Sequence, residues 1–237
     1  MPTNSSDSLD LYAKVEDLLG IEEATPRLNA HYLLFLQSVS PKSLLDVGCG
    51  SGSFLVQMKQ ALDLDAVKGI DLSPLMVAHT KAKGIDAECI DLCELQGTYD
   101  VITAVFDMVN YLDKKSLKKF LSCIAAHLND GGYFIFDVNT LFGFENVAVG
   151  AFIVDDEDRF LAIDSDFDHP RYRMELTLFE KENAQFSKSQ EEITQYYHTV
   201  ETLSSHPKLS LISAEEVSLY DLGEADKYLV ILRKIPH

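Results

Sequence analysis

Three glycines follow an apolar segment at a spacing that suits a ligand-binding turn. Gly48, Gly50 and Gly52 come directly after residues 43–47, which we interpret as a strand, and an amphipathic segment begins just beyond them. In an open α/β sheet, ligands bind at the carboxyl ends of the strands, where glycine lets the backbone approach them closely. A tight strand-to-helix turn alone would need only one of the three glycines. The segment therefore predicts a cofactor-binding loop.

Two carboxylates accompany this loop. Asp46 lies inside the predicted strand, a costly position for a charge unless its side chain faces a ligand. Asp71 ends the next apolar segment, where a carboxylate can accept bonds from both hydroxyls of a ribose. The dinucleotide-binding pattern would require a third glycine at position 53, which is Ser53 here. This difference argues against a nicotinamide cofactor.

The spacing of Asp46 and the three glycines resembles the first motif of the class I S-adenosylmethionine-dependent methyltransferases, an acidic residue followed by G-x-G-x-G. The resemblance covers about residues 43–138 and the last two predicted strands. It implies that the loop passes beneath the methionine part of S-adenosylmethionine and that Asp71 binds its ribose. The cofactor contacts implied by the resemblance are Asp46, Gly48, Cys49, Gly50, Asp71, Leu72, Asp91, Leu92, Phe106 and Tyr12.

The segment from Phe106 to Leu112 reads FDMVNYL and resembles small-molecule methyltransferases, including those that act on sugar amines. It lacks the N/D-P-P-Y/F motif of enzymes that methylate nucleobases or glutamine amides. Phe106 and Asp107 are expected where the methyl group meets the substrate. If the acceptor is an amine, Asp107 or Tyr111 is expected to take or relay its proton.

Further polar residues are candidates for substrate contact. Asp137, Asn139 and Thr140 close the fifth predicted strand at the same rim, although a polar strand-to-loop transition explains them equally well. Asn110 and His198 complete this predicted set, and His169 is a weaker candidate for a base. Arg27 is either a partner of the cofactor carboxylate or a surface cation. The histidines show no metal-binding spacing, so we predict no metal.

Strands and helices alternate through residues 43–138, which predicts a doubly wound, mostly parallel sheet of seven strands. Strands are predicted at 43–47, 67–70, 87–90, 99–106, 133–138, 209–220 and 227–234, and helices at 9–19, 27–39, 54–62, 74–83, 116–128 and 199–205. Residues 142–197 alternate in polarity instead and predict an antiparallel β insertion. We expect a cofactor domain of residues 1–141 and 206–237, with cap helices in 1–40, and a substrate lid of residues 142–205.

The composition limits the partners. The 237 residues carry a formal net charge of −18, which repels nucleic acids and anionic membranes. The chain shows no signal-peptide pattern and no apolar run long enough to cross a bilayer, so a cytoplasmic location is expected. The four cysteines lack paired spacing, which predicts reduced, mostly buried thiols without zinc or a disulfide framework. A homodimer is the assembly we consider.

Together these features predict an S-adenosylmethionine-dependent methyltransferase that acts on a small molecule, with N-methylation of an amine as the preferred reaction. Two alternatives stay open at this point. One is a nicotinamide-dependent oxidoreductase, and the other is a cofactor-binding protein without catalysis. The sequence does not identify the acceptor, since N-, O- and C-methylation can use the same cofactor site.

Overall fold

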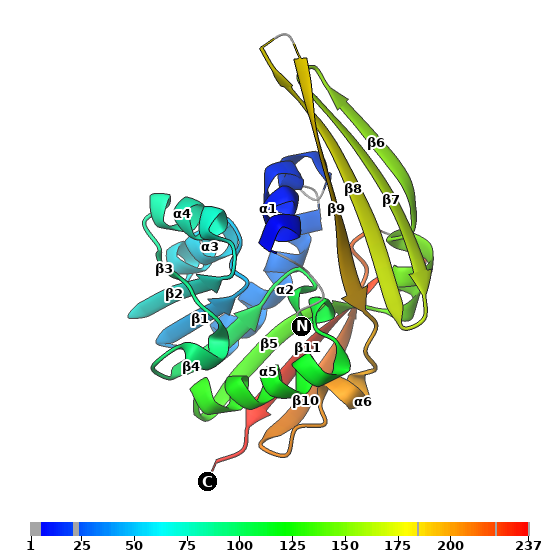
Figure 1. The fold of residues 1–237 in the computed structure, drawn as a ribbon. Coiled ribbons are helices and arrows are strands. Elements are labelled where there is room, and N and C mark those ends of the chain that lie inside the picture. Colours follow the sequence, from blue (N-terminus) through cyan, green and yellow to red (C-terminus); the bar gives the residue numbers. More distant parts are fainter. Residues whose placement is uncertain (1–5, 21–23, 184, 221, 237) are drawn as a thin grey trace.

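The computed structural model describes residues 6–20, 24–183, 185–220 and 222–236. It contains two sheets with helix α1 (Ser6–Val15) lying between them (Figure 1). In the described part of the chain, no helix combines the length and apolar character needed to cross a bilayer.

Sheet A has seven strands in the order β10-β11-β5-β4-β1-β2-β3. They are β1 (Ser43–Val47), β2 (Ala66–Asp71), β3 (Asp86–Cys89), β4 (Tyr99–Ala104), β5 (Leu128–Asn139), β10 (Leu209–Val217) and β11 (Lys227–Lys234). Strands β1 to β5 pair in parallel, and β11 runs antiparallel to both of its neighbours. The predicted doubly wound, mostly parallel sheet is confirmed.

Helices cover both faces of sheet A. Helices α2 (Ala24–Val39) and α3 (Ser53–Ala61) pack on one face, while α5 (Lys114–His127) and α6 (Val200–Leu203) pack on the other. Alternate residues of the central strands supply the two cores, as Leu44 and Leu45 of β1 do. Helix α4 (Pro74–Ala82) follows β2 and begins with Pro74, and the Ser73 hydroxyl caps it, as the sequence Ser73-Pro74 predicts.

Strand β5 is longer than predicted. It starts at Leu128 and includes the segment 129–132, where the sequence predicts a turn. The pairing of β4 with β5 is irregular between Tyr99 and Val101, and Gly131 has a φ of 77°. The glycines therefore form an irregularity within a strand instead of a turn before it.

Sheet B is the antiparallel insertion, with strands β6 (Gly150–Asp156), β7 (Arg159–Asp168), β8 (Arg171–Glu182) and β9 (Gln185–Tyr196). Strand β6 was not predicted, because Phe152, Ile153 and Val154 are consecutive apolar residues without alternation. Helix α1 buries Leu11 and Val15 against the face of sheet B that carries Leu161 and Ile193.

Four short helical turns connect these elements. They are η1 (Glu16–Leu18), η2 (Leu92–Glu94), η3 (Met108–Tyr111) and η4 (Gly143–Val147). The turns η2 and η3 directly follow the ends of β3 and β4, where ligand contacts are predicted.

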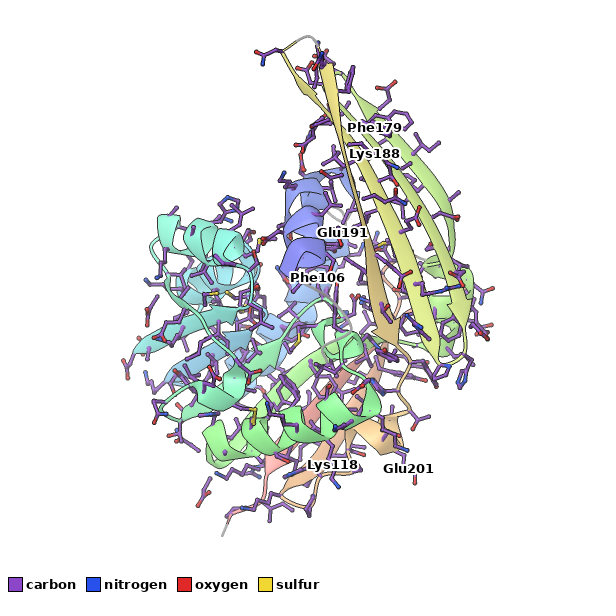
Figure 2. All side chains as sticks on the ribbon, in the orientation of Figure 1. Phe106, Lys118, Phe179, Lys188, Glu191 and Glu201 are labelled. Atoms are coloured by element: carbon purple, nitrogen blue, oxygen red, sulfur yellow. A yellow bond between two sulfur atoms is a disulfide. The ribbon has the colours of Figure 1, made fainter. Side chains whose placement is uncertain are left out.

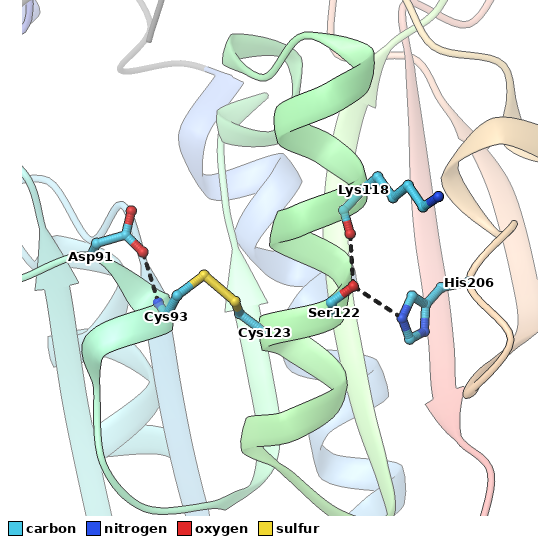
Figure 3. Close-up of a disulfide and its surroundings, with 6 residues drawn as sticks. All are labelled: Asp91, Cys93, Lys118, Ser122, Cys123 and His206. Carbon is cyan, nitrogen blue, oxygen red and sulfur yellow. Dashed lines mark hydrogen bonds between the residues drawn. A yellow bond between two sulfur atoms is a disulfide. The ribbon is translucent and has the colours of Figure 1, made fainter. Parts of the chain in front are cut away.

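The cysteine prediction was wrong in two respects. Cys93 and Cys123 form a disulfide that joins η2 to α5 (Figure 3). They lie 30 positions apart, and the packing of α5 beside η2 brings them together, so their spacing in the sequence gave no sign of the bond. Of the two free thiols, Cys49 is buried as expected but Cys89 is exposed.

Removing this disulfide is expected to lower stability. In the chain-entropy account, a crosslink across 30 positions stabilises the fold by about 3–4 kcal/mol. We expect Cys123→Ser to reduce the free energy of unfolding by about 2–4 kcal/mol in urea denaturation without reductant. Cys89→Ser is the matched control, because that thiol is free. Identical unfolding midpoints for Cys123→Ser and the wild type would contradict the expectation.

Candidate active site

The glycine loop lies at the carboxyl end of β1 and is held by β2. The amides of Gly48 and Cys49 donate to the Ile70 carbonyl at 2.8 and 3.0 Å. A Cβ at Gly48 would lie 2.6 Å from the side chain of Met108, whereas a Cβ at Gly50 would meet no atom within 4 Å. The loop therefore packs tightly against η3 and leaves open space beside Gly50, where its φ of 52° also favours glycine.

Asp71 connects this loop to the start of α4. Its Oδ2 accepts a hydrogen bond from the Gly50 amide at 2.9 Å, and its Oδ1 accepts one from the Ser73 amide at 2.8 Å. Burial raises the pKa of this carboxyl, although the amide donors oppose the rise. Each carboxylate oxygen can accept a second bond. Asp71 can therefore hold the loop and bind a hydroxyl-bearing ligand together.

Asp46 lies behind the loop within β1 and is only 2% exposed. The Thr103 hydroxyl of β4 donates to its Oδ1 at 2.7 Å. Burial raises the pKa of the Asp46 carboxyl to about 7, and the Asp71 and Asp137 carboxylates add to the rise. A ligand that brings positive charge to the loop would favour the ionised form of this group.

The other predicted cofactor contacts are divided between surface and core. Leu72 keeps 55% of its surface exposed, and Asp91 is exposed with its Oδ1 accepting from the Cys93 amide at 2.8 Å. The side chains of Leu92 and Cys49 are buried in the two cores. A ligand at this rim can reach Leu72 and Asp91 through their side chains, but Leu92 and Cys49 only through their backbone.

Beyond β4 the chain turns through two left-handed residues. Phe106 has a φ of 58° and Asp107 a φ of 47°, each costing about 1–3 kcal/mol for a residue other than glycine. The Asp137 carboxylate at β5 accepts both of their amides, at 2.7 and 2.9 Å. Asp137 is fully buried and lies behind the turn, and its predicted contact with the substrate stays a prediction.

A buried lysine lies between these carboxylates. The Lys227 ammonium is 2.6 Å from Oδ1 of Asp107 and 3.0 Å from Oδ2 of Asp137, and it donates to Oδ1 of Asn139 at 3.1 Å. Gln195 of β9 donates to the second oxygen of Asp107 at 2.8 Å. Asp107 is therefore held from sheet A and from sheet B together.

These contacts set the charge state of the group. Burial alone would raise the pKa of Asp107, but the Lys227 ammonium lowers it below its usual value, assisted by Gln195 and Asn139. Burial alone would lower the pKa of Lys227, but the Asp107 and Asp137 carboxylates raise it. Both groups are ionised at neutral pH, so Asp107 is a weak base.

Two phenols lie near the Asp107 carboxylate. Tyr12 of α1 and Tyr111 of η3 pack with the cluster that joins α1 to sheet B. Burial raises the pKa of both phenols, and the charge of Asp107 raises them further. Both hydroxyls stay protonated at neutral pH and can donate hydrogen bonds. Figure 2 shows Phe106 in the middle of the molecule, below α1.

Comparison with known proteins identifies the family. A family model described as methyltransferase domain matches residues 21–205. The chain belongs to the methyltransferase domain family. A curated relative from Geobacillus sp. (strain WCH70), whose methyltransferase name is provisional, is 29% identical over 127 residues, 49% of this chain. The match spans 50% of that relative, so the chain covers about half of its length.

Solved structures of methyltransferases share the fold. An S-adenosylmethionine-dependent methyltransferase from Clostridium acetobutylicum is similar with a TM-score of 0.77 and 19% identity, over 97% of this chain and 98% of that one. The sugar N-methyltransferase KedS8 from Streptoalloteichus is similar with a TM-score of 0.75 and 19% identity, over 96% of this chain and 92% of that one. The amino pentose methyltransferase CalS10 from Micromonospora echinaspora is similar with a TM-score of 0.72 and 21% identity, over 94% of this chain and 96% of that one. At these identities the likeness establishes the fold.

The predicted membership of a methyltransferase family is confirmed by the family model. The nicotinamide alternative falls with the family assignment. The residues present fit the methyltransferase cofactor, because the Gly50 backbone borders open space, Asp71 has acceptor capacity left, and Leu72 offers an exposed apolar surface. Which atoms these residues contact stays a prediction.

Two other predicted site residues, Asn110 and His198, form hydrogen bonds within the protein. The side-chain amide of Asn110 donates to the Tyr196 carbonyl at 2.8 Å, and its Oδ1 accepts from the backbone N–H of Asn139 at 2.9 Å. His198 is buried, and its Nε2 lies 2.8 Å from the Leu112 carbonyl. Burial lowers the pKa of His198. These contacts tie the end of sheet B to η3 and favour structural roles over substrate contact.

The remaining candidates lie in other contacts. Arg27 is exposed, and its guanidinium donates to the Leu219 carbonyl at 3.0 Å. Thr140 donates to the Ala225 carbonyl at 2.8 Å and accepts from the Gly143 amide, which places it at the start of η4. His169 makes an edge-to-face contact with Phe167 and a tilted ring contact with Tyr197 within the insertion.

Two central residues of this methyltransferase site, Lys227 and Gln195, were not predicted from the sequence. Gln195 lies at the end of an alternating strand and is unremarkable in sequence. Lys227 does carry a signal, because it is the first residue of the apolar strand β11 and follows Asp226 directly. A cation at the start of a strand buried on both faces requires a buried partner.

Proposed function

We propose that this chain transfers the methyl group of S-adenosylmethionine to the amino group of a small molecule. The carrying observation is the ionised Asp107 carboxylate, whose side chain is 22% exposed beside the Tyr12 and Tyr111 phenols. Two acidic side chains, Asp107 and Asp137, surround the single Lys227 ammonium, and this acidic surplus favours a basic acceptor. The names of KedS8 and CalS10, a sugar N-methyltransferase and an amino pentose methyltransferase, support an amino sugar.

The chemistry assigned to these residues is alignment. Bound S-adenosylmethionine supplies a methyl group that its sulfonium already activates, so the protein needs chiefly to orient the acceptor and exclude water. Asp107 would accept a hydrogen bond from the amine or from a neighbouring hydroxyl. Tyr12 and Tyr111 would donate hydrogen bonds to oxygen atoms of the methyl acceptor, because both phenol hydroxyls remain protonated. The lowered pKa of Asp107 favours this orienting role over the proton transfer predicted from the sequence.

Sheet B is proposed as the substrate lid. Its strand β9 contacts the site through Gln195 and through the Tyr196 carbonyl, which accepts from Asn110. Its inner face and α1 form one cluster that encloses Tyr12 and Tyr111. Deleting residues 150–196 should abolish acceptor turnover; unchanged turnover would exclude a lid role.

An acceptor screen tests the function. We expect release of S-adenosylhomocysteine when S-adenosylmethionine is incubated with amino sugars, and none with matched sugars that carry hydroxyl in place of amino. Turnover of the hydroxyl series alone would overturn N-methylation. Calorimetric binding of S-adenosylhomocysteine without turnover of any acceptor would favour the non-catalytic alternative.

The pH dependence should follow the acceptor and not the protein. Because Asp107 stays ionised and Tyr111 protonated around neutral pH, the kcat/KM for an amino acceptor at saturating S-adenosylmethionine should rise with pH until the amine is neutral. Asp107→Asn should raise the KM for the acceptor and keep the shape of this profile. A protein-derived acid limb that disappears in Asp107→Asn would show instead that Asp107 is a base.

A further inference from the structure

The turn at Phe106 and Asp107 is the most strained feature of the described site. Two consecutive residues other than glycine have positive φ angles, and although aspartate tolerates this backbone better than most residues, the bulky side chain of Phe106 does not favour it. Such a conformation persists only where the surrounding structure fixes it. The structure around the turn must therefore supply the stabilisation.

The stabilising group is the Asp137 carboxylate. Its two oxygens accept the two amides of the strained residues at 2.7 and 2.9 Å, so one side chain defines the direction of both peptide groups. The Tyr32 hydroxyl donates to Oδ1 at 2.8 Å, and the Lys227 ammonium lies 3.0 Å from Oδ2. Tyr32 and Lys227 are buried, which makes their contacts with this carboxylate strong and fixed in direction.

Lys227 completes the arrangement with a three-way geometry. An ammonium has three N–H donors, and this one has three oxygen partners in Asp107, Asp137 and Asn139. The side chain of Asp107 is thus fixed by the same cation that neutralises Asp137. Backbone and carboxylate of the turn are positioned from one buried cluster.

The turn reaches the cofactor loop through its next residue. The side chain of Met108 lies against Gly48, where a Cβ would come within 2.6 Å of Met108 Cγ. A change in the peptide direction at 106–107 would displace Met108 and the loop together. The turn therefore couples the acceptor side of the site to the glycine loop.

We propose that Asp137 and Lys227 are positioning residues that hold the Phe106–Asp107 turn in its left-handed form. In this way they align the cofactor loop with the Asp107 carboxylate, which faces the methyl acceptor in the proposed function. The inference rests on the proposed function for the place of the turn beside the methyl group. It does not depend on the identity of the acceptor.

A double-mutant cycle with glycine tests the proposal. Asp137→Asn replaces one amide acceptor by a donor, and we expect it to weaken S-adenosylhomocysteine binding, measured by calorimetry, by about tenfold or more. Phe106→Gly permits the left-handed backbone without support. In the Phe106→Gly background, Asp137→Asn should therefore cost about threefold or less. Equal losses in both backgrounds would overturn the proposal, since a merely structural carboxylate would not respond to glycine at position 106.

A milder variant covers the case in which Asp137→Asn does not fold. Tyr32→Phe removes one donor from the same carboxylate and leaves both amide bonds, so its smaller loss should also disappear in the Phe106→Gly background. Ser38→Ala, an exposed hydroxyl on α2 that bonds only its own helix, is the matched control. Because these readouts use the product cofactor alone, a failed acceptor screen would refute the proposed function without affecting this test.

Discussion

Asp71→Ala is expected to weaken binding of S-adenosylhomocysteine by about a hundredfold, the largest loss of affinity among single substitutions in this site. The reason is that Asp71 has two functions. It accepts the Gly50 and Ser73 amides, which fixes the loop and the start of α4, and its remaining lone pairs are the predicted acceptors for a ribose. Calorimetric titration of both proteins measures the difference.

Two variants separate these functions. Asp71→Asn keeps one carbonyl oxygen and should lose about tenfold, because its amide nitrogen cannot accept the second backbone N–H. Asp86→Ala removes an exposed carboxylate on β3 that pairs with Lys68 of β2, and this variant should bind as the wild type does. Asp71→Ala with undiminished affinity would rule out a cofactor role for Asp71.

Asp46→Asn is expected to stabilise the cofactor-free protein at alkaline pH while weakening cofactor binding. The fold raises the pKa of Asp46 from 3.8 to about 7, chiefly by burial. Between these values the folded state holds a proton that the unfolded state has released, so stability falls as pH rises from about 4 to 7 and is constant above. With about 1.4 kcal/mol for each tenfold change in acidity, the loss amounts to about 4 kcal/mol.

The measurement is the free energy of unfolding in urea between pH 5 and 8.5, with no cofactor. The wild type should lose stability across this range. Asp46→Asn should lose less, and the difference between the two losses should be about a few kcal/mol. Thr103→Val serves as a second variant, since removing the donor to Asp46 should raise its pKa further and extend the loss of stability to higher pH. A pH slope that is the same in the wild type and in Asp46→Asn would show that Asp46 does not titrate in this range.

The regular parts of the fold could be predicted because they depend on local pattern. The glycine loop, the cap at Ser73 and the seven strands of sheet A all follow from short segments of sequence. Strand β6 could not be predicted in this way, since its apolar residues are exposed at a sheet edge and do not alternate. The disulfide was missed for a related reason, because it depends on the packing of α5 beside η2.

The site residues also differ in whether local sequence could reveal them. Asp46, Asp71 and Asp107 could be recognised because each ends or interrupts an apolar strand, which draws attention to its charge. Their partners come from distant segments: Lys227 lies 120 positions after Asp107 and Gln195 lies 88 positions after it. The sequence therefore indicated that Asp137 is important at the rim, but its role behind the turn depends on residues that only the folded chain brings together.

The position of β11 also affects how this protein can be synthesised. Strand β11 lies between β5 and β10, and its first residue is Lys227. During translation, β1 to β5 leave the ribosome well before β11, so β5 is an unpaired sheet edge and Asp137 lacks its cation until residue 227 emerges. A nascent chain of this kind is exposed to edge-to-edge aggregation during that interval. Folding of the cofactor sheet and completion of the reaction site are therefore one late event in synthesis.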